Sequence, residues 1–194
     1  MLNDVSAGRS EPVRIGISGS YGGLNLGDEA ILSGIIGGLR RSLARLEITV
    51  FSRNAEDTRR RHRVERVVPV RSLSRSEVVP EVKRLDLLIL GGGGILYDAD
   101  AATYLREAAI AQDADVPVVV YAVSAGPLHD PSVQAMVRER LNKAEAVTVR
   151  ERNAKCLLED IGVEKDIVVT ADPALLLESQ PVDSSLWKEE GLEG

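Results

Sequence analysis

Two short runs of the sequence are apolar almost from end to end. Residues 85–90 read LDLLIL and residues 116–122 read VPVVVYA, so both faces of each predicted strand carry hydrophobic side chains. Such strands must be covered on both faces, as they are in parallel sheets flanked by helices. Five further strands are predicted at 13–18, 47–51, 66–70, 146–149 and 167–170. Because longer stretches of helical period separate these runs, we predict an α/β fold with a doubly wound, mostly parallel, Rossmann-like sheet.

The clearest helical stripe follows the first predicted strand. Its apolar residues recur three or four positions apart, at Leu32, Ile35, Ile36, Leu39 and Leu43. This spacing predicts a helix that begins near Asp28. Gly34, Gly37 and Gly38 interrupt the helix, and each costs up to about 1 kcal/mol relative to alanine. We therefore expect this helix to pack closely against the sheet. Other helices are predicted at 72–84, 131–141 and 154–161.

The chain of 194 residues is long enough for one domain with a full core. We expect this domain to span 13–177, after a flexible N-terminal tail at 1–12. Beyond Leu177 the sequence becomes polar and loses its period. Residues 178–194 are therefore predicted to form a linker or tail towards a missing second domain.

Composition limits the partners. A net charge of −6 and an aromatic content of 3% argue against nucleic-acid binding. The single cysteine, Cys156, excludes a disulfide framework and favours a reducing, cytoplasmic location. The basic run at 59–66 is interpreted as a solvated helix face, with contact to an acidic membrane surface as the alternative. No Cys/His cluster has metal-ligand spacing, so neither a metal nor a cofactor is expected.

Ligands of doubly wound folds bind outside the carboxyl ends of the strands, which directs attention to the loops there. The first loop, 19–27, holds four glycines but lacks the Lys-Ser/Thr of a Walker A motif and the spacing of G-x-G-x-x-G. Nucleotide binding is therefore disfavoured. Asp28 is predicted to cap the following helix, with Glu29 opposing its positive end, or to bind sugar hydroxyls together with Asn25.

Four other segments at strand ends supply candidate ligand-binding residues. Four consecutive glycines, 91–94, predict a loop closely approached by a ligand or by another element, with Gly92 and Gly93 as candidates. His129 lies in the loop 124–130. Arg150 follows the strand 146–149 and can clamp a carboxylate or phosphate, or tie two loops together. Asp172 is held extended by the proline after it. No catalytic triad emerges, and the catalytic residues stay unassigned.

Five motifs in order resemble the polysaccharide pyruvyl transferase family. They lie at 22–32, 91–98, 125–128, 149–151 and 170–173. The resemblance covers roughly 13–177 and corresponds to the N-terminal half of family members only. The segment 150–153 departs from the family's usual arginine-aspartate with a nearby serine.

The resemblance implies transfer of a pyruvyl group from phosphoenolpyruvate to sugar hydroxyls of a cell-surface polysaccharide. Such enzymes look like two Rossmann-type halves facing a cleft, as in GT-B glycosyltransferases. The catalytic histidine and the arginines for phosphoenolpyruvate lie mostly in the C-terminal half, so this chain alone is expected to be inactive. A lipid-linked sugar acceptor, peripheral membrane contact and a homo-oligomer are all compatible with the sequence.

Two alternatives stay open at this point. The chain could be a non-catalytic binding or assembly module, in which the glycines serve helix–sheet packing alone. It could also be half of a GT-B glycosyltransferase that uses a nucleotide sugar, although no acidic residue stands out at the expected ribose position.

Overall fold

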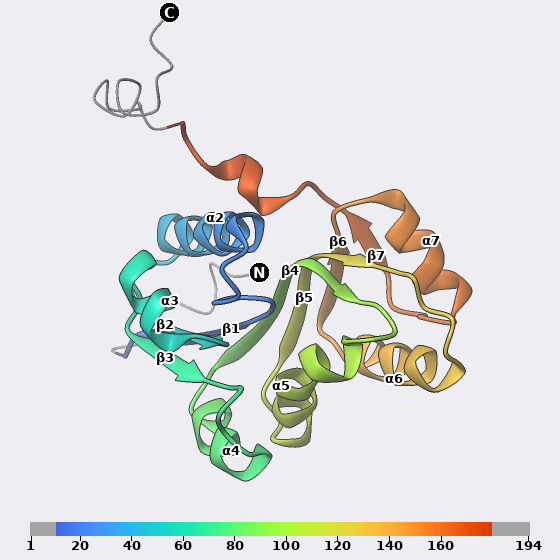
Figure 1. Cartoon of the computed structure of the whole chain (residues 1–194), viewed down its shortest axis with the longest axis horizontal. Helices are drawn as coiled ribbons and strands as arrows, with labels where there is room; N and C mark the ends of the chain where they lie inside the picture. Colours follow the sequence, from blue (N-terminus) through green and yellow to red (C-terminus); the bar gives the residue numbers. More distant parts are fainter. Residues whose placement is uncertain (1–10, 180–194) are drawn as a thin grey trace, which may run out of the picture.

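A computed structural model of the chain describes residues 11–179 and shows one parallel sheet covered by helices (Figure 1). The predicted tails at 1–12 and 178–194 lie almost wholly outside these residues. The strands are β1 (Val13–Ser18), β2 (Leu46–Ser52), β3 (Arg66–Pro69), β4 (Leu87–Leu96), β5 (Val118–Ala125), β6 (Ala146–Val149) and β7 (Ile167–Val169). The helices are α2 (Leu26–Ser42), α3 (Ala55–Arg61), α4 (Arg75–Lys83), α5 (Ala101–Asp113), α6 (Pro131–Asn142), α7 (Arg152–Asp160) and the 3₁₀ helix η1 (Pro173–Leu176).

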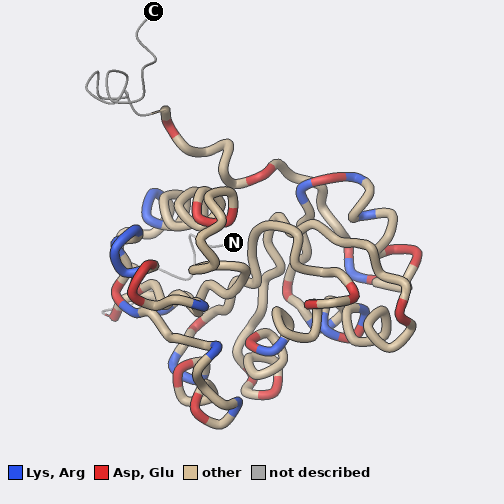
Figure 2. The backbone as a smooth tube through the Cα atoms, in the orientation of Figure 1, with Lys and Arg blue, Asp and Glu red and all other residues tan. Residues whose placement is uncertain are grey.

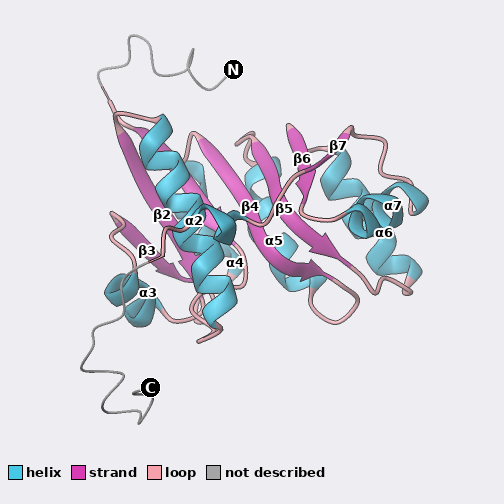
Figure 3. Ribbon diagram, turned by 90° about the horizontal axis from the view of Figure 1, so that it is seen from above, coloured by secondary structure: helices cyan, strands magenta, loops and turns pink. Residues whose placement is uncertain are grey.

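The seven strands follow the order β3-β2-β1-β4-β5-β6-β7, and every neighbouring pair is parallel. Figure 3 shows the strand arrows all pointing the same way. Alternate residues of the central strands face opposite cores. Ile15 and Ile17 of β1 pack with α2, whereas Leu88 and Leu90 of β4 pack with α4, α5 and α6. The predicted doubly wound α/β fold is confirmed.

The strand order reverses between β1 and β4. Chain connections from β1 lead to β2 and β3 on one side, and those from β4 lead to β5, β6 and β7 on the other. The loops that leave the carboxyl ends of β1 and β4 therefore separate and leave a crevice, the usual ligand site of such folds.

The prediction that residues 91–94 form a loop is wrong, because these residues continue β4. Gly93 pairs with Val123 and Gly94 with Ser124 of β5, which itself extends to Ala125. Gly92 and Gly93 have φ of 77° and 82°, values that favour glycine. A Cβ on Gly92 would lie 2.1 Å from Cγ2 of Ile31. The expected close approach at Gly92 is thus made by α2.

The glycines inside α2 do not all serve packing against the sheet. A Cβ on Gly34 would lie 2.1 Å from the carbonyl oxygen of Pro173, so Gly34 lets η1 lie directly on α2. A Cβ on Gly38 would have no neighbour within 4 Å. The expected close contact is therefore with η1, and Gly38 has no packing role.

These two glycines predict opposite effects of the same substitution. Gly34→Ala should lower the free energy of unfolding by about 1–3 kcal/mol, because η1 must move away from α2. Gly38→Ala should raise it by up to about 1 kcal/mol, because alanine favours the helix and meets nothing. Urea denaturation of both variants measures this, and a stable Gly34→Ala protein would contradict the tight contact with η1.

Candidate functional site

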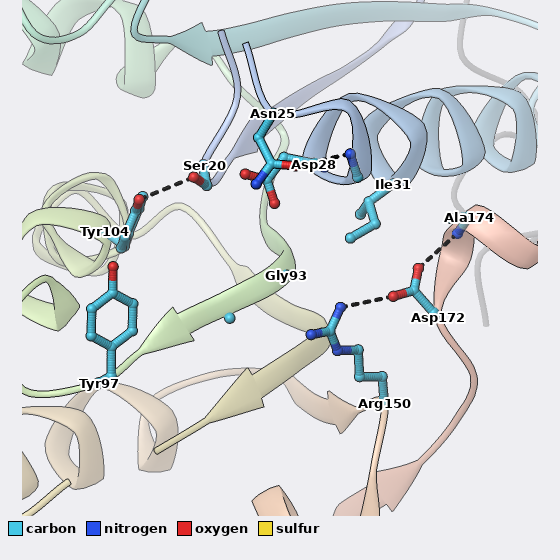
Figure 4. Close-up of a pocket in the computed structure, with 12 residues that line it drawn as sticks. Ser20, Asn25, Asp28, Ile31, Gly93, Tyr97, Tyr104, Arg150, Asp172 and Ala174 are labelled. Atoms are coloured by element: carbon cyan, nitrogen blue, oxygen red, sulfur yellow. Dashed lines mark hydrogen bonds and ion pairs between the residues drawn. The ribbon is translucent and has the colours of Figure 1, made fainter. Parts of the chain in front are cut away.

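A pocket of about 450 Å³ opens at the switch point between β1 and β4 (Figure 4). The loop after β1, the end of β4 and the segments after β6 and β7 contribute its walls. Five of the residues predicted to bind a ligand line it together: Asn25, Asp28, Gly93, Arg150 and Asp172. Residues from four distant parts of the sequence are thereby brought to one cavity.

The start of α2 brings Asn25 and Asp28 to the pocket in different roles. Asn25 is the residue that caps α2, because its Oδ1 accepts hydrogen bonds from the backbone N–H groups of Gly27 (2.9 Å) and Asp28 (3.4 Å). The prediction that Asp28 caps the helix is wrong, since the helix already begins at Leu26. Asp28 lies in the first turn, and Figure 2 shows acidic residues at this end of α2 and basic residues at the other.

The carboxyl group of Asp28 is half-buried at the pocket wall beside Gly93. A Cβ on Gly93 would lie only 2.9 Å from Asp28 Oδ1, so glycine is what leaves room for this carboxylate. Burial raises the pKa of Asp28 by removing the charged form from water, and the neighbouring Glu29 adds to the rise. A hydrogen bond with Ser20 and the charges of Arg53 and Arg150 oppose it.

Glu29 points away from the pocket and ties the first loop to α3. Its Oε1 accepts a hydrogen bond from the N–H of Gly22 at 2.8 Å, and its Oε2 lies 2.8 Å from Nε2 of His62. Both side chains are buried. The predicted solvated face therefore does not include His62, which follows the last residue of α3 and is buried against Glu29. No sequence signal marks this pairing across 33 residues.

Arg150, which follows β6, and Asp172, which lies after β7, form an ion pair at the wall of the pocket. Arg150 Nη1 lies 2.8 Å from Asp172 Oδ2, and Arg150 Nε lies 3.2 Å from a carboxylate oxygen of Glu151. Asp172 Oδ1 also accepts the N–H of Ala174 at 2.9 Å and so caps η1. Of the two roles predicted for Arg150, the structure shows the tie between loops.

Sequence reasoning missed three hydroxyl groups that line the pocket. Tyr104 Oη donates to Ser20 Oγ at 3.1 Å, and Tyr97 Oη donates to Asp100 at 2.5 Å. The bond to Asp100 raises the pKa of Tyr97 to about 12, so this phenol stays protonated, and while it donates to Asp100 its oxygen can accept a hydrogen bond from another group. Tyr97 lies three positions after the last glycine of the run, whereas nothing in the sequence singles out Tyr104.

Two predicted residues lie outside the pocket lining. Gly92 sits behind the wall, against Ile31 and Tyr21. His129 is exposed, and its backbone N–H donates to the Asp98 carboxylate at 2.8 Å. A ligand role for either residue stays a prediction.

The described residues contain neither a metal-binding cluster nor a membrane-spanning helix. Within 11–179, no three His, Cys, Asp or Glu residues are grouped so that they could hold a metal ion. No helix in the same range is long and apolar enough to cross a membrane.

Comparison with known proteins gave one family and a fold likeness. A family model described as polysaccharide pyruvyl transferase matches residues 25–188. No curated protein matches the chain. A putative UDP-N-acetylglucosamine 2-epimerase from Listeria monocytogenes is similar in structure, with 13% identity and a TM-score of 0.53 over 86% of this chain and 46% of that one. A second structure, described as UDP-N-acetylglucosamine 2-epimerase, gives 11% identity and a TM-score of 0.54 over 91% and 54%.

The chain thus spans about half the length of these solved structures. At such low identity the likeness concerns the fold alone, which is that of one domain of a GT-B-like enzyme.

The raised pKa of Asp28 can be measured by NMR titration of its carboxyl group. Ser20→Ala should raise it further, because the hydrogen bond that favours the carboxylate is lost. Since the folded state favours the protonated form, Asp28 contributes stability at low pH that is lost as pH rises through its folded pKa. Asp28→Asn should therefore gain stability relative to the wild type over that pH interval. A pKa below that of an unfolded aspartate would contradict the burial of this group.

We expect truncation of the two histidines to lower the free energy of unfolding by very different amounts. His62→Ala should lower the free energy of unfolding by about 2 kcal/mol or more, because Glu29 stays buried without one of its partners. His129→Ala should change it by less than about 0.5 kcal/mol, because that side chain is exposed. Thermal or urea unfolding of both variants tests the prediction, and equal costs would refute a structural role for the buried pair.

Proposed function

This chain belongs to the polysaccharide pyruvyl transferase family, and from that we propose that it forms the acceptor-binding half of an enzyme transferring a pyruvyl group from phosphoenolpyruvate to sugar hydroxyls of a cell-surface polysaccharide. The observation that carries the proposal is the convergence of Asn25, Asp28, Gly93, Arg150 and Asp172 in one pocket. These residues come from four of the five motifs that carry the family resemblance.

The lining of the pocket suits a sugar. Hydroxyl groups of Ser20, Tyr97 and Tyr104 line the same pocket as the Asp28 carboxylate, and hydroxyl and carboxylate oxygens suit the hydroxyl groups of a saccharide. Gly93 and Gly94 present backbone without side chains, which lets a ring approach closely. With two carboxylates and one guanidinium, the pocket keeps a negative charge when both acids are ionised. That charge favours a neutral sugar ring over phosphoenolpyruvate.

The reaction requires a base at the attacking sugar hydroxyl and an acid at the donor. Protonation of the methylene carbon of phosphoenolpyruvate makes C2 electrophilic, and the sugar oxygen then bonds to C2 and loses its proton. Loss of phosphate and attack by a second hydroxyl complete a ketal. We assign the proton from the first hydroxyl to Asp28, because a carboxylate of raised pKa is the better base.

The donor needs cations, and the described part of the chain offers few of them in the pocket. Arg150 is already paired with Asp172 and Glu151, and no other Lys or Arg among residues 11–179 lines the cavity. We therefore place the acid and the cations for phosphoenolpyruvate in a second half of the enzyme, and we expect the reaction to take place in the cytoplasm. An isolated chain of residues 1–194 should bind the acceptor without turnover.

Two variants of the complete enzyme separate a catalytic aspartate from a structural one. Asp28→Asn should lower kcat by about a hundredfold or more, because general base catalysis is lost, with less than about 1 kcal/mol change in the free energy of unfolding. Asp115→Asn makes the same change at an exposed position before β5 and should leave kcat unchanged. Phosphate release from phosphoenolpyruvate in the presence of a nitrophenyl sugar measures both. Full activity of Asp28→Asn would remove Asp28 from the mechanism.

The isolated chain provides the second test of the proposed function. Calorimetry should detect binding of a sugar acceptor. An assay of phosphate release from phosphoenolpyruvate should detect no turnover. Robust turnover by residues 1–194 would overturn the assignment to half an enzyme. Failure to bind any acceptor would favour the interaction module instead.

A further inference from the structure

A second cavity, of about 720 Å³, lies between α2 and the segment that joins α3 to β3. Four residues of α2 and five consecutive residues beyond it line this cavity: Ser33, Ile36, Gly37, Arg40 and 61–65. The two sides are held together by Arg40, whose Nη2 donates to the backbone carbonyl of Arg63 and lies 3.1 Å from Oε1 of Glu65. None of these residues lines the pocket at the switch point, so the cavity is a separate feature of the surface.

The cavity is rich in arginine. Arg40, Arg61 and Arg63 line it directly. A Cβ on the lining residue Gly37 would lie 3.3 Å from Nη1 of Arg41, so a fourth guanidinium group adjoins the cavity. All four arginines are exposed, and Figure 2 shows basic residues both in α3 and at the far end of α2. Their N–H groups are therefore within reach of a ligand.

Two carboxylates offset only part of this charge. Glu65 pairs with Arg40 at 3.1 Å, and the buried Asp57 pairs with Arg61 at 2.8 Å. The other two arginines form no ion pair with any carboxylate among residues 11–179. Four guanidinium groups against two carboxylates leave an excess of two positive charges, in a chain whose net charge is −6. The cavity thus attracts an anion that the rest of the chain repels.

The apolar part of the lining indicates which kind of anion fits. Ile36 and Val64 line the cavity together with the arginines. Arginine side chains cover apolar surface with their methylene groups and keep the guanidinium group in water. A ligand that carries apolar groups beside a phosphate, as a phospholipid does, can use both parts of such a lining. A small inorganic anion can use only the guanidinium groups.

We propose that this cavity binds the phosphate group of an anionic phospholipid, so that the protein docks on a membrane surface through α2 and the end of α3. Guanidinium groups bind phosphate oxygens through paired N–H donors, and basic residues are attracted to an anionic bilayer. Asp28 lies twelve residues before Arg40 on α2, about 18 Å along the helix axis. The lipid site and the pocket are therefore separate, and the inference does not depend on the proposed function.

Flotation of residues 1–194 with lipid vesicles tests the docking surface. Vesicles of equal parts phosphatidylglycerol and phosphatidylcholine should bind the protein at least about tenfold more tightly than vesicles of phosphatidylcholine alone, because only the former carry a net charge. Raising the ionic strength to about 1 M should release most of the protein, because the Debye length falls to about 3 Å. Equal binding to both kinds of vesicle, or binding to neither, would overturn the proposal.

Two double variants separate this cavity from the overall charge of the chain. Arg40→Gln/Arg63→Gln should weaken binding to the anionic vesicles by about tenfold or more, because two cations that line the cavity are lost. The matched control, Arg138→Gln/Arg152→Gln, removes two exposed arginines of α6 and α7 and should change binding by less than about twofold. An equal loss in both double variants would refute the site.

A single variant covers the case in which Arg40→Gln/Arg63→Gln does not fold, which circular dichroism would reveal. Arg63→Gln breaks no ion pair among residues 11–179 and should still weaken binding to the anionic vesicles by about threefold or more. Unchanged binding of this folded variant would also refute the site. Asp28→Asn should leave vesicle binding unchanged, because Asp28 lies in the other pocket.

A soluble ligand distinguishes a lipid from a free phosphate compound. In calorimetry, glycerol 3-phosphate should bind at least about tenfold more weakly than the anionic vesicles, because a membrane offers many headgroups at once and adds apolar contacts. If glycerol 3-phosphate binds as tightly as the vesicles and Arg40→Gln/Arg63→Gln abolishes that binding, the cavity serves a free phosphate compound and the assignment to a membrane is wrong.

Discussion

The buried carboxylate of Glu29 determines where the first loop lies, and the pocket depends on that loop. A buried carboxylate is costly unless it is paired and hydrogen-bonded. Glu29 meets this requirement by accepting the N–H of Gly22 and by contacting His62 at the end of α3. These contacts connect the loop after β1 with α2 and α3, and they hold the two ends of the segment from Gly22 to Glu29 together. Asn25 and Asp28 are carried in that loop and the first helical turn.

The geometry of the helix explains why the adjacent carboxylates of Asp28 and Glu29 have different surroundings. Successive residues of an α-helix point about 100° apart, so Asp28 and Glu29 cannot face the same surroundings. Asp28 faces the pocket beside Gly93, whereas Glu29 faces the protein interior. Asn25 accepts the N–H groups of Gly27 and Asp28, so Asp28 is not needed as the cap of α2.

Much of the fold and most of the candidate site could be predicted because they depend on local pattern. Apolar runs such as 85–90 mark buried strands, and the residues just after strands meet at one edge of a parallel sheet. That reasoning found Asp28, Arg150 and Asp172. It failed at Gly91–Gly94, where pairing with β5 overrides the poor strand propensity of glycine.

The remaining site features come from contacts between residues distant in sequence. Tyr104 reaches Ser20 only because α5 packs beneath the carboxyl end of β1, and Arg53 reaches Tyr104 across 51 residues. His62 looks like one member of a basic run until α3 is placed beside α2. No period or motif encodes such contacts.

The pairing of Arg150 with Asp172 means that the pocket carries its own counter-ion. A small anion from solution must displace Asp172 to reach Arg150, and it must also leave Asp172 without its cation while that residue caps η1. Free phosphate and other abundant anions are therefore at a disadvantage in the resting pocket. An uncharged ligand meets no such competition, so the ion pair disfavours small anions relative to neutral molecules.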